Sequence, residues 1–245
     1  MPRYLIILTA LLALSGCCFN FSKPTSEPYL MGWWQFLDNP GSVAKDNSGN
    51  GNDAIINGAT WKDGTLYFDG VDDCVITPIV DTLQNFTMEA WVNAYTDSPH
   101  VMDLISKRSF NALSYDDFPF ALVIDKTGLR ADVAIDGGND YSWDMSAATT
   151  EFEPGWRHIA ATYDSSTLNI YVDGQLSGSK KGSLNLSRNS LPYTIGRAAC
   201  EAPGQVNQIR FKGSIGEVWI YSGALSPEQI YQNYNYSVSI YRADE

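Results

Sequence analysis

Basic side chains are scarce in this chain of 245 residues, which has 16 lysines and arginines against 28 aspartates and glutamates. The formal net charge of −12 argues against nucleic acid as a partner, because the surface would repel its phosphates. Such a charge suits a solvated, exported protein or one that binds calcium. Simple solubility needs no further assumption and is the first interpretation.

Histidine and cysteine are rare as well, with two and four residues. The sequence contains no Cys-x-x-Cys motif and no cluster of cysteine with histidine, so a zinc site is not expected. It also lacks the Gly-x-Ser-x-Gly and His-Glu-x-x-His motifs of esterases and zinc proteases. Each of these absences counts against an enzyme.

The apolar run Leu5–Leu14 has ten residues, about half of what a membrane-spanning helix needs. Arg3 precedes this run and two small residues follow it, which predicts a signal peptide over residues 1–16. Leu14–Cys17 resembles the lipobox of bacterial lipoproteins. This resemblance implies cleavage before Cys17, lipid on its sulfur and an exported protein anchored to a membrane of the bacterial cell envelope. The alternative is an ordinary secretory signal.

Residues 17–30 contain two prolines and many polar side chains, which predicts a flexible tether behind the anchor. Export would place the folded part in an oxidising compartment, so Cys74 and Cys200 are a candidate disulfide. The alternative is two free thiols that lie too far apart in the fold.

The stretch Trp156–Gly174 shows the pattern on which the rest of the fold assignment depends. Apolar and polar residues alternate twice with a period of two, and the polar residues Asp164–Ser166 separate the two runs. Asp173-Gly174 then suits a two-residue type I′ turn before a third strand. Similar short runs predict an all-β sandwich over residues 31–238, with residues 239–245 as a tail. The other expected strands are 33–36, 61–68, 74–79, 85–94, 118–124, 129–135, 193–196 and 211–221.

One helix is expected near the C-terminus. Ser226 is a good N-cap, Pro227 fits the first helical position, and Gln229 completes a capping box. Ile230 and Tyr234 share one face, which indicates packing across the sandwich.

The order of these features resembles the LamG-like jelly-roll domains of the concanavalin A-like lectin/glucanase superfamily, from about Gly32 to Tyr234. The resemblance implies two packed antiparallel sheets of about six strands each. It is carried by Trp34–Phe36, Asp46–Gly51, Leu66–Gly70, Phe86–Val92, Trp156–His158, Thr162–Asp164, Tyr171–Gly174, Ile195–Arg197, Phe211–Ile215 and Leu225–Ile230.

A loop with the spacing of a calcium site begins at Asp46. Asp46, Ser48 and Asn50 alternate and Gly51 follows, as at the start of an EF-hand loop, where alternate side chains converge on one cation. The twelfth position is Asn57 rather than a bidentate glutamate, so a remote carboxylate would be needed.

The resemblance implies that this acid comes from the final strand, where Glu217 is available. The family usually has aspartate at the position of Gly216, so this chain lacks one ligand that the resemblance implies. The alternative is an Asx-rich turn that caps its own backbone.

Catalysis has little support from the sequence. The glucanase branch has Glu-x-Asp-x-x-Glu on one strand, and no glutamate here has aspartate two residues later. The nearest pair, Glu151 and Glu153, is expected in a loop. The two histidines are His100 and His158, and His158 is expected to pack or donate a hydrogen bond.

Ligand binding is therefore the expected activity, with carbohydrate or glycoprotein as the ligand. Aromatic faces stack on sugar C–H surfaces while carboxylates and amides bind hydroxyls. Glu89 and Trp91 share a strand face, and the loop 136–144 adds Tyr141 and Trp143. The alternative for Trp91 is packing beneath loops or the final helix. A protein–protein adhesion module is the alternative function, and a glycoside hydrolase is the third.

Overall fold

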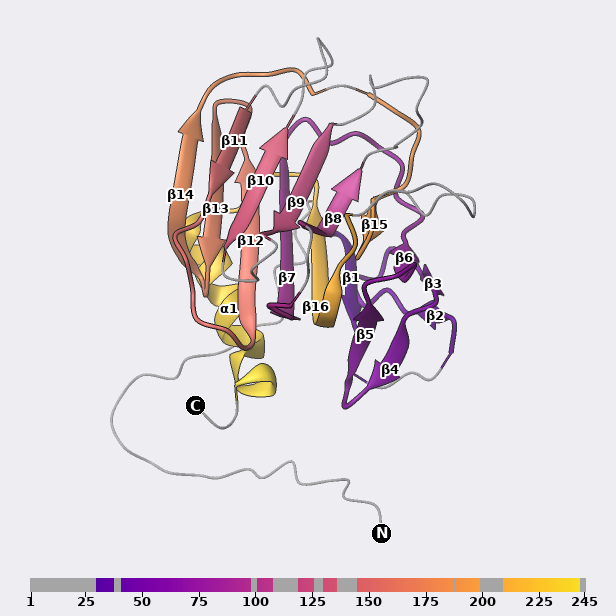
Figure 1. Cartoon of the computed structure of the whole chain (residues 1–245). Helices are drawn as coiled ribbons and strands as arrows, with labels where there is room; N and C mark the ends of the chain where they lie inside the picture. Colours follow the sequence, from indigo (N-terminus) through magenta and orange to yellow (C-terminus); the bar gives the residue numbers. More distant parts are fainter. Residues whose placement is uncertain are drawn as a thin grey trace, which may run out of the picture.

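Two antiparallel sheets face each other in the computed structural model (Figure 1). It describes residues 30–37, 41–97, 101–107, 119–125, 130–135, 145–186, 188–198 and 209–242. Within these residues each sheet has eight strands, so the expected all-β sandwich is confirmed but the expected size of about six strands per sheet is wrong.

Sheet A has the order β14-β13-β12-β7-β16-β5-β4, and β1 also pairs with β16. Its strands are β1 (Leu30–Gln35), β4 (Thr60–Lys62), β5 (Thr65–Asp69), β7 (Phe86–Ala94), β12 (Arg157–Tyr163), β13 (Thr167–Val172), β14 (Gln175–Lys181) and β16 (Lys212–Tyr221).

Sheet B has the order β11-β10-β9-β8-β15-β6-β3-β2. Its strands are β2 (Val43–Ala44), β3 (Ala54–Asn57), β6 (Cys74–Ile76), β8 (Met102–Lys107), β9 (Phe120–Ile124), β10 (Ala131–Ile135), β11 (Met145–Ala148) and β15 (Thr194–Ile195). Several of these are too short to give a periodic signal in the sequence.

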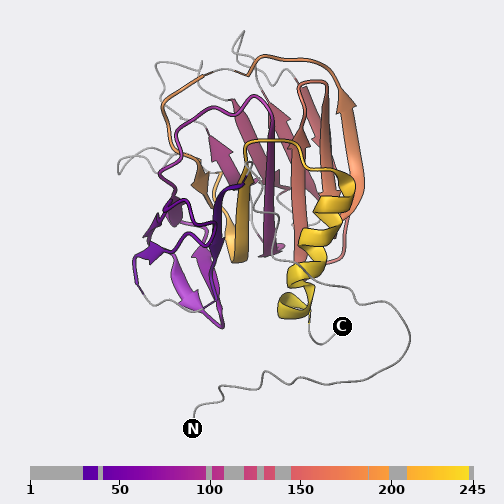
Figure 2. The same ribbon diagram turned by 180° about the vertical axis from the view of Figure 1, so that it is seen from behind.

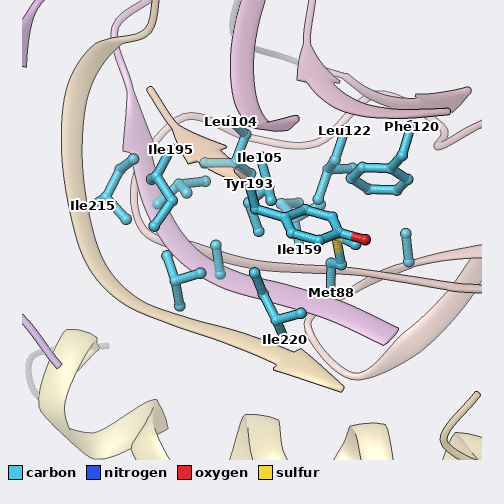
Figure 3. Close-up of a cluster of buried hydrophobic side chains, with 14 of the residues drawn as sticks. Met88, Leu104, Ile105, Phe120, Leu122, Ile159, Tyr193, Ile195, Ile215 and Ile220 are labelled. Carbon is cyan, nitrogen blue, oxygen red and sulfur yellow. The ribbon is translucent and has the colours of Figure 1, made fainter. Parts of the chain in front are cut away.

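The inner faces of the two sheets form the main core (Figure 3). Met88 and Ile159 from sheet A meet Leu122 and Ile195 from sheet B, and all four are fully buried. In β7 every second residue points into this core, so the predicted alternation is confirmed. The other residues of β7 lie on the outer face of sheet A, the face turned away from sheet B.

The predicted meander is confirmed as β12, β13 and β14. Asp173 and Gly174 both have positive φ, at 52° and 75°, as a type I′ turn requires. The strand expected over 61–68 is instead a hairpin of β4 and β5. Asp63 and Gly64 turn the chain there with φ of 50° and 71°.

The helix α1 (Pro227–Tyr241) has the predicted capping box. The Gln229 amide nitrogen donates to Ser226 Oγ at 3.3 Å, and the Ser226 amide donates to Gln229 Oε1 at 2.9 Å. The helix lies across the outer face of sheet A (Figure 2). No helix in the described part of the chain is long and apolar enough to cross a membrane.

Cys74 is buried in β6 and takes part in a disulfide bond. Cys200, its predicted partner, lies outside the described residues. The Cys74–Cys200 pairing therefore stays a prediction.

Candidate functional site

A groove of about 310 Å³ lies on the outer face of sheet A, beside the last turn of α1. Its lining includes Thr65 of β5, Asn93 of β7 and Ser214 of β16. Ser214 pairs with Asn93 on one side and with Tyr67 on the other, so three neighbouring strands contribute. Their outward side chains place an amide and hydroxyl groups in one depression.

Aromatic rings stand around this groove. Tyr95 follows β7 and is 37% exposed, and its ring centroid lies 6.1 Å from that of Tyr67. The ring of Tyr241, at the end of α1, lies 5.0 Å from that of Trp156 between centroids and is tilted by 38°, and both rings line the groove with Ile240. Rings beside amide and hydroxyl groups are the combination that binds sugars.

The turn between β4 and β5 brings charges of both signs to the groove. Lys62 and Asp63 both line it, and the Lys62 ammonium lies 5.3 Å from the centre of the Tyr67 ring. Groups of opposite charge side by side favour a polar ligand over a strongly charged one.

Glu89 and Trp91 lie elsewhere on this face, fully buried beneath α1. The Trp91 ring stacks on Tyr234 at 5.6 Å and on Tyr241 at 5.0 Å. The expectation that Glu89 and Trp91 form a ligand-binding surface is therefore corrected. The alternative of packing beneath the final helix is what the structure shows, because the helix supplies the partner rings.

Polar groups beneath α1 form a network that joins the helix to sheet A. The Asn233 amide donates to Glu89 Oε1 at 2.8 Å, and Ser237 Oγ donates to Glu217 Oε2 at 2.6 Å. His158 Nε2 lies 3.0 Å from Glu89 Oε2, with both side chains fully buried. The expected structural role of His158 fits this position, whereas His100 lies outside the described residues.

Glu217 belongs to this network rather than to the Asp46 loop. The Trp33 indole donates to its second oxygen. Burial raises the pKa of Glu217 to about 7, even though the hydrogen bonds from Ser237 and Trp33 favour its charged form.

The Asp46 loop uses its carboxylate to hold its own backbone. Asp46 Oδ1 accepts from the amides of Trp33 and Ser48, and Oδ2 accepts from Ser48 Oγ and the Asn52 amide, at 2.8–3.0 Å. The Asn50 amide donates to the Leu30 carbonyl at 2.7 Å.

These residues do not fit the calcium site expected from Asp46, Ser48, Asn50 and Glu217. Strand β1 separates the Asp46 loop from β16, since Trp34 bridges to Asp46 while its neighbour Gln35 pairs with Glu217. We derive no role for calcium from this loop.

A second depression, of about 620 Å³, is lined by Glu151, Glu153, Arg157 and Asp173. Glu151 and Glu153 are exposed in the loop between β11 and β12, as expected. The Asp173 carboxylate accepts from Arg157 at 3.4 Å and from Arg242 at 2.8 Å. Through Arg242, the Asp173 carboxylate serves the attachment of α1.

Sequence reasoning missed the groove, although one signal pointed to it. Asn93 lies two residues after Trp91 on the same strand face, and Tyr95 continues that alternation. The other predicted ligand-binding residues, Tyr141 and Trp143, lie outside the described residues, as does Cys17.

A family model described as the concanavalin A-like lectin/glucanases superfamily matches residues 68–231. The chain belongs to this superfamily. No curated protein matches its sequence.

Solved structures extend the likeness to nearly the whole chain. Trypanosoma rangeli sialidase in complex with sialic acid has a TM-score of 0.62 and 20% identity, over 88% of this chain and 34% of that one. For the binding domain of botulinum neurotoxin serotype D the TM-score is 0.60 and the identity 16%, over 84% of this chain and 51% of that one. For the binding domain of Paraclostridial Mosquitocidal Protein 1 the TM-score is 0.63 and the identity 16%, over 86% of this chain and 53% of that one. At such identities these structures show a shared fold, and the chain spans about a third to a half of their length.

Proposed function

We propose that this superfamily domain is a non-catalytic carbohydrate-binding module, which binds a glycan in the groove beside the last turn of α1. The observation that carries the proposal is the meeting of Tyr95, Trp156 and Tyr241 with Asn93 and Ser214 in one depression. The exposed Tyr95 ring can stack on a sugar C–H face, and the amide and hydroxyl groups can bind sugar hydroxyls. Tyr241 is buried between Trp91 and Trp156 and contributes to the groove wall. Support also comes from the similar structures, of which two are binding domains and one is a sialidase in complex with sialic acid.

The position of the carboxylates supports a module without catalysis. Most glycoside hydrolases use two carboxyl groups that flank the sugar, although sialidases use a tyrosine as the nucleophile. Glu89 and Glu217 lie on neighbouring strands of the outer face, but both are fully buried and bound to side chains of α1.

Removing groove side chains tests the proposal. Asn93→Ala and Tyr95→Ala are each expected to weaken glycan affinity by about tenfold, because each removes a hydrogen-bonding or stacking group worth about 1–2 kcal/mol. The ligand would first be found by a glycan array with the purified protein, and its affinity measured by calorimetry.

Tyr231→Ala is the matched control, because Tyr231 is 46% exposed on α1 and does not line the groove. Unchanged affinity in both groove variants, with melting temperatures like that of the parent protein, would contradict the proposed site.

We further propose that the domain is exported and held on a membrane of the bacterial cell envelope by lipid on Cys17. The support is the apolar run Leu5–Leu14 followed by small residues and Cys17. Cys17→Ser is expected to move the protein from the membrane fraction to the soluble fraction and to abolish labelling by a palmitate analogue. Cys18→Ser is the control, and equal labelling of both variants would contradict lipidation at Cys17.

A further inference from the structure

The last turn of α1 is part of the groove wall. Ile240 and Tyr241 line the groove, and the Tyr241 ring lies directly over Gly216 of β16. A Cβ atom at residue 216 would stand 2.1 Å from that ring, a distance that side chains do not adopt. Glycine at this position therefore makes room for Tyr241, and the wall has its observed shape only while α1 is seated on the sheet.

Three attachments seat the helix along its length. Asn233 binds Glu89 of β7, and one turn later Ser237 binds Glu217 of β16. At the C-cap, Arg242 donates to the Trp156 carbonyl at 2.7 Å and to Asp173 at 2.8 Å. Two of the three depend on glutamates that have no exposed surface.

We propose that α1 is an acid-stabilised strap, in which proton uptake by Glu217 tightens the seating of the helix and thereby completes the glycan-binding wall of the groove. This inference rests on the proposed function, because it concerns regulation of the same site. Its physical basis is that a buried carboxylate without a cationic partner is less stable than a buried carboxylic acid.

Burial and the charge of Glu89 favour the neutral form of Glu217, and the hydrogen bonds that its carboxylate accepts oppose this only in part. Trp33 and Gln35 of β1 and Ser237 of α1 are uncharged hydrogen-bonding partners. The ionisable groups nearby are Glu89 on β7, His158 on β12, and the phenols of Tyr221, Tyr236 and Tyr241. Glu89 is the acid whose charge opposes ionisation of Glu217. His158 contacts Glu89, and Arg242 is engaged by Asp173.

The direction of the pH effect follows from linkage. With α1 seated the pKa of Glu217 is about 7, and with α1 lifted it returns to the ordinary value near 4.5. The seated state therefore binds a proton that the lifted state lacks between about pH 4.5 and 7. Seating is strongest below this window, weakens as the pH rises through it, and changes no further above pH 7 through this group.

Hydrogen exchange of α1 amides tests the strap without any glycan. In the full chain, protection corrected for intrinsic exchange is expected to be about twentyfold higher at pH 5.5 than at pH 7.5. Glu217→Gln keeps the shape of the side chain but does not titrate, so its protection is expected to be equal at the two values. Glu153→Gln, at an exposed glutamate, is the matched control and should behave like the parent chain.

Two results would overturn the inference. One is a pH effect that persists in Glu217→Gln, which would assign it to the contact of His158 with Glu89. The other is a glycan whose affinity is equal at both pH values while protection of α1 changes, which would separate the helix from the groove. If α1 responds as expected but no glycan binds at any pH, the proposed function fails while acid-stabilised seating is supported.

Discussion

Trp91→Ala is expected to lower the free energy of unfolding by about 3–5 kcal/mol, the usual cost of removing a fully buried large aromatic side chain. Trp91 has no exposed surface and contacts rings from two other elements. His158 lies at 5.5 Å between ring centroids, while Tyr234 and Tyr241 stack on the indole from α1. The alanine variant would leave a cavity between the sheet and the helix.

Denaturant unfolding followed by circular dichroism measures this change. The control is Tyr231→Ala, which removes a half-exposed ring from the same helix and should change stability by less than about 1 kcal/mol. If Trp91→Ala cost no more than Tyr231→Ala, the indole would not hold α1 on the sheet.

Glu89→Leu is expected to destabilise the protein by a similar amount, about 3–5 kcal/mol. The substitution leaves the buried His158 imidazole without the carboxylate that lies 3.0 Å away. It also removes one acceptor of the Asn233 side-chain amide, whose remaining acceptor is the Tyr221 hydroxyl at 3.0 Å. The free-energy cost of leaving one buried polar group without its partner exceeds the net stabilisation that the hydrogen-bonded pair contributed.

Replacing both partners separates these two effects. Glu89→Leu combined with His158→Leu should recover part of the lost stability, because no polar ring is left unpaired. If Glu89→Leu/His158→Leu lost more stability than the two single variants together, the coupling of Glu89 with His158 would be contradicted.

Lys45→Met is a comparison at an exposed ion pair. The Lys45 ammonium lies 2.6 Å from the Asp53 carboxylate, and its removal should lower the free energy of unfolding by less than about 1 kcal/mol.

The fold could be predicted from the sequence wherever the alternation of side chains was long enough. In β7 nine residues alternate between the core and the outer face, and α1 begins at a capping box that needs four residues to recognise. β2 and β15 have two residues each, so their place in sheet B follows only from pairing with distant strands.

The candidate site was harder to predict because its parts are far apart in the chain. The groove joins Asn93, Trp156, Ser214 and Tyr241, which no local pattern connects. On α1 the buried positions include Asn233 and Ser237, and a polar inner stripe does not give the apolar period by which packed helix faces are recognised.

The Asp46 loop illustrates a different difficulty. Alternating oxygen-bearing side chains with a glycine suit both a cation and an Asx-type turn. The choice depends on where the carboxylate oxygens point, and here they accept hydrogen bonds from Trp33, Ser48 and Asn52.

The position of β16 has a consequence for the order in which the domain can form. Residues 212–215 of this strand pair with β5 and residues 217–221 pair with β1, while its other edge pairs with β7. The first strand of the described chain, β1, therefore has no partner in sheet A until residues 217–221 have been synthesised. Such long-range pairing delays folding. Sheet A therefore cannot be completed before its final strand emerges, which leaves time for the chain to cross a membrane before it folds, as the proposed export requires.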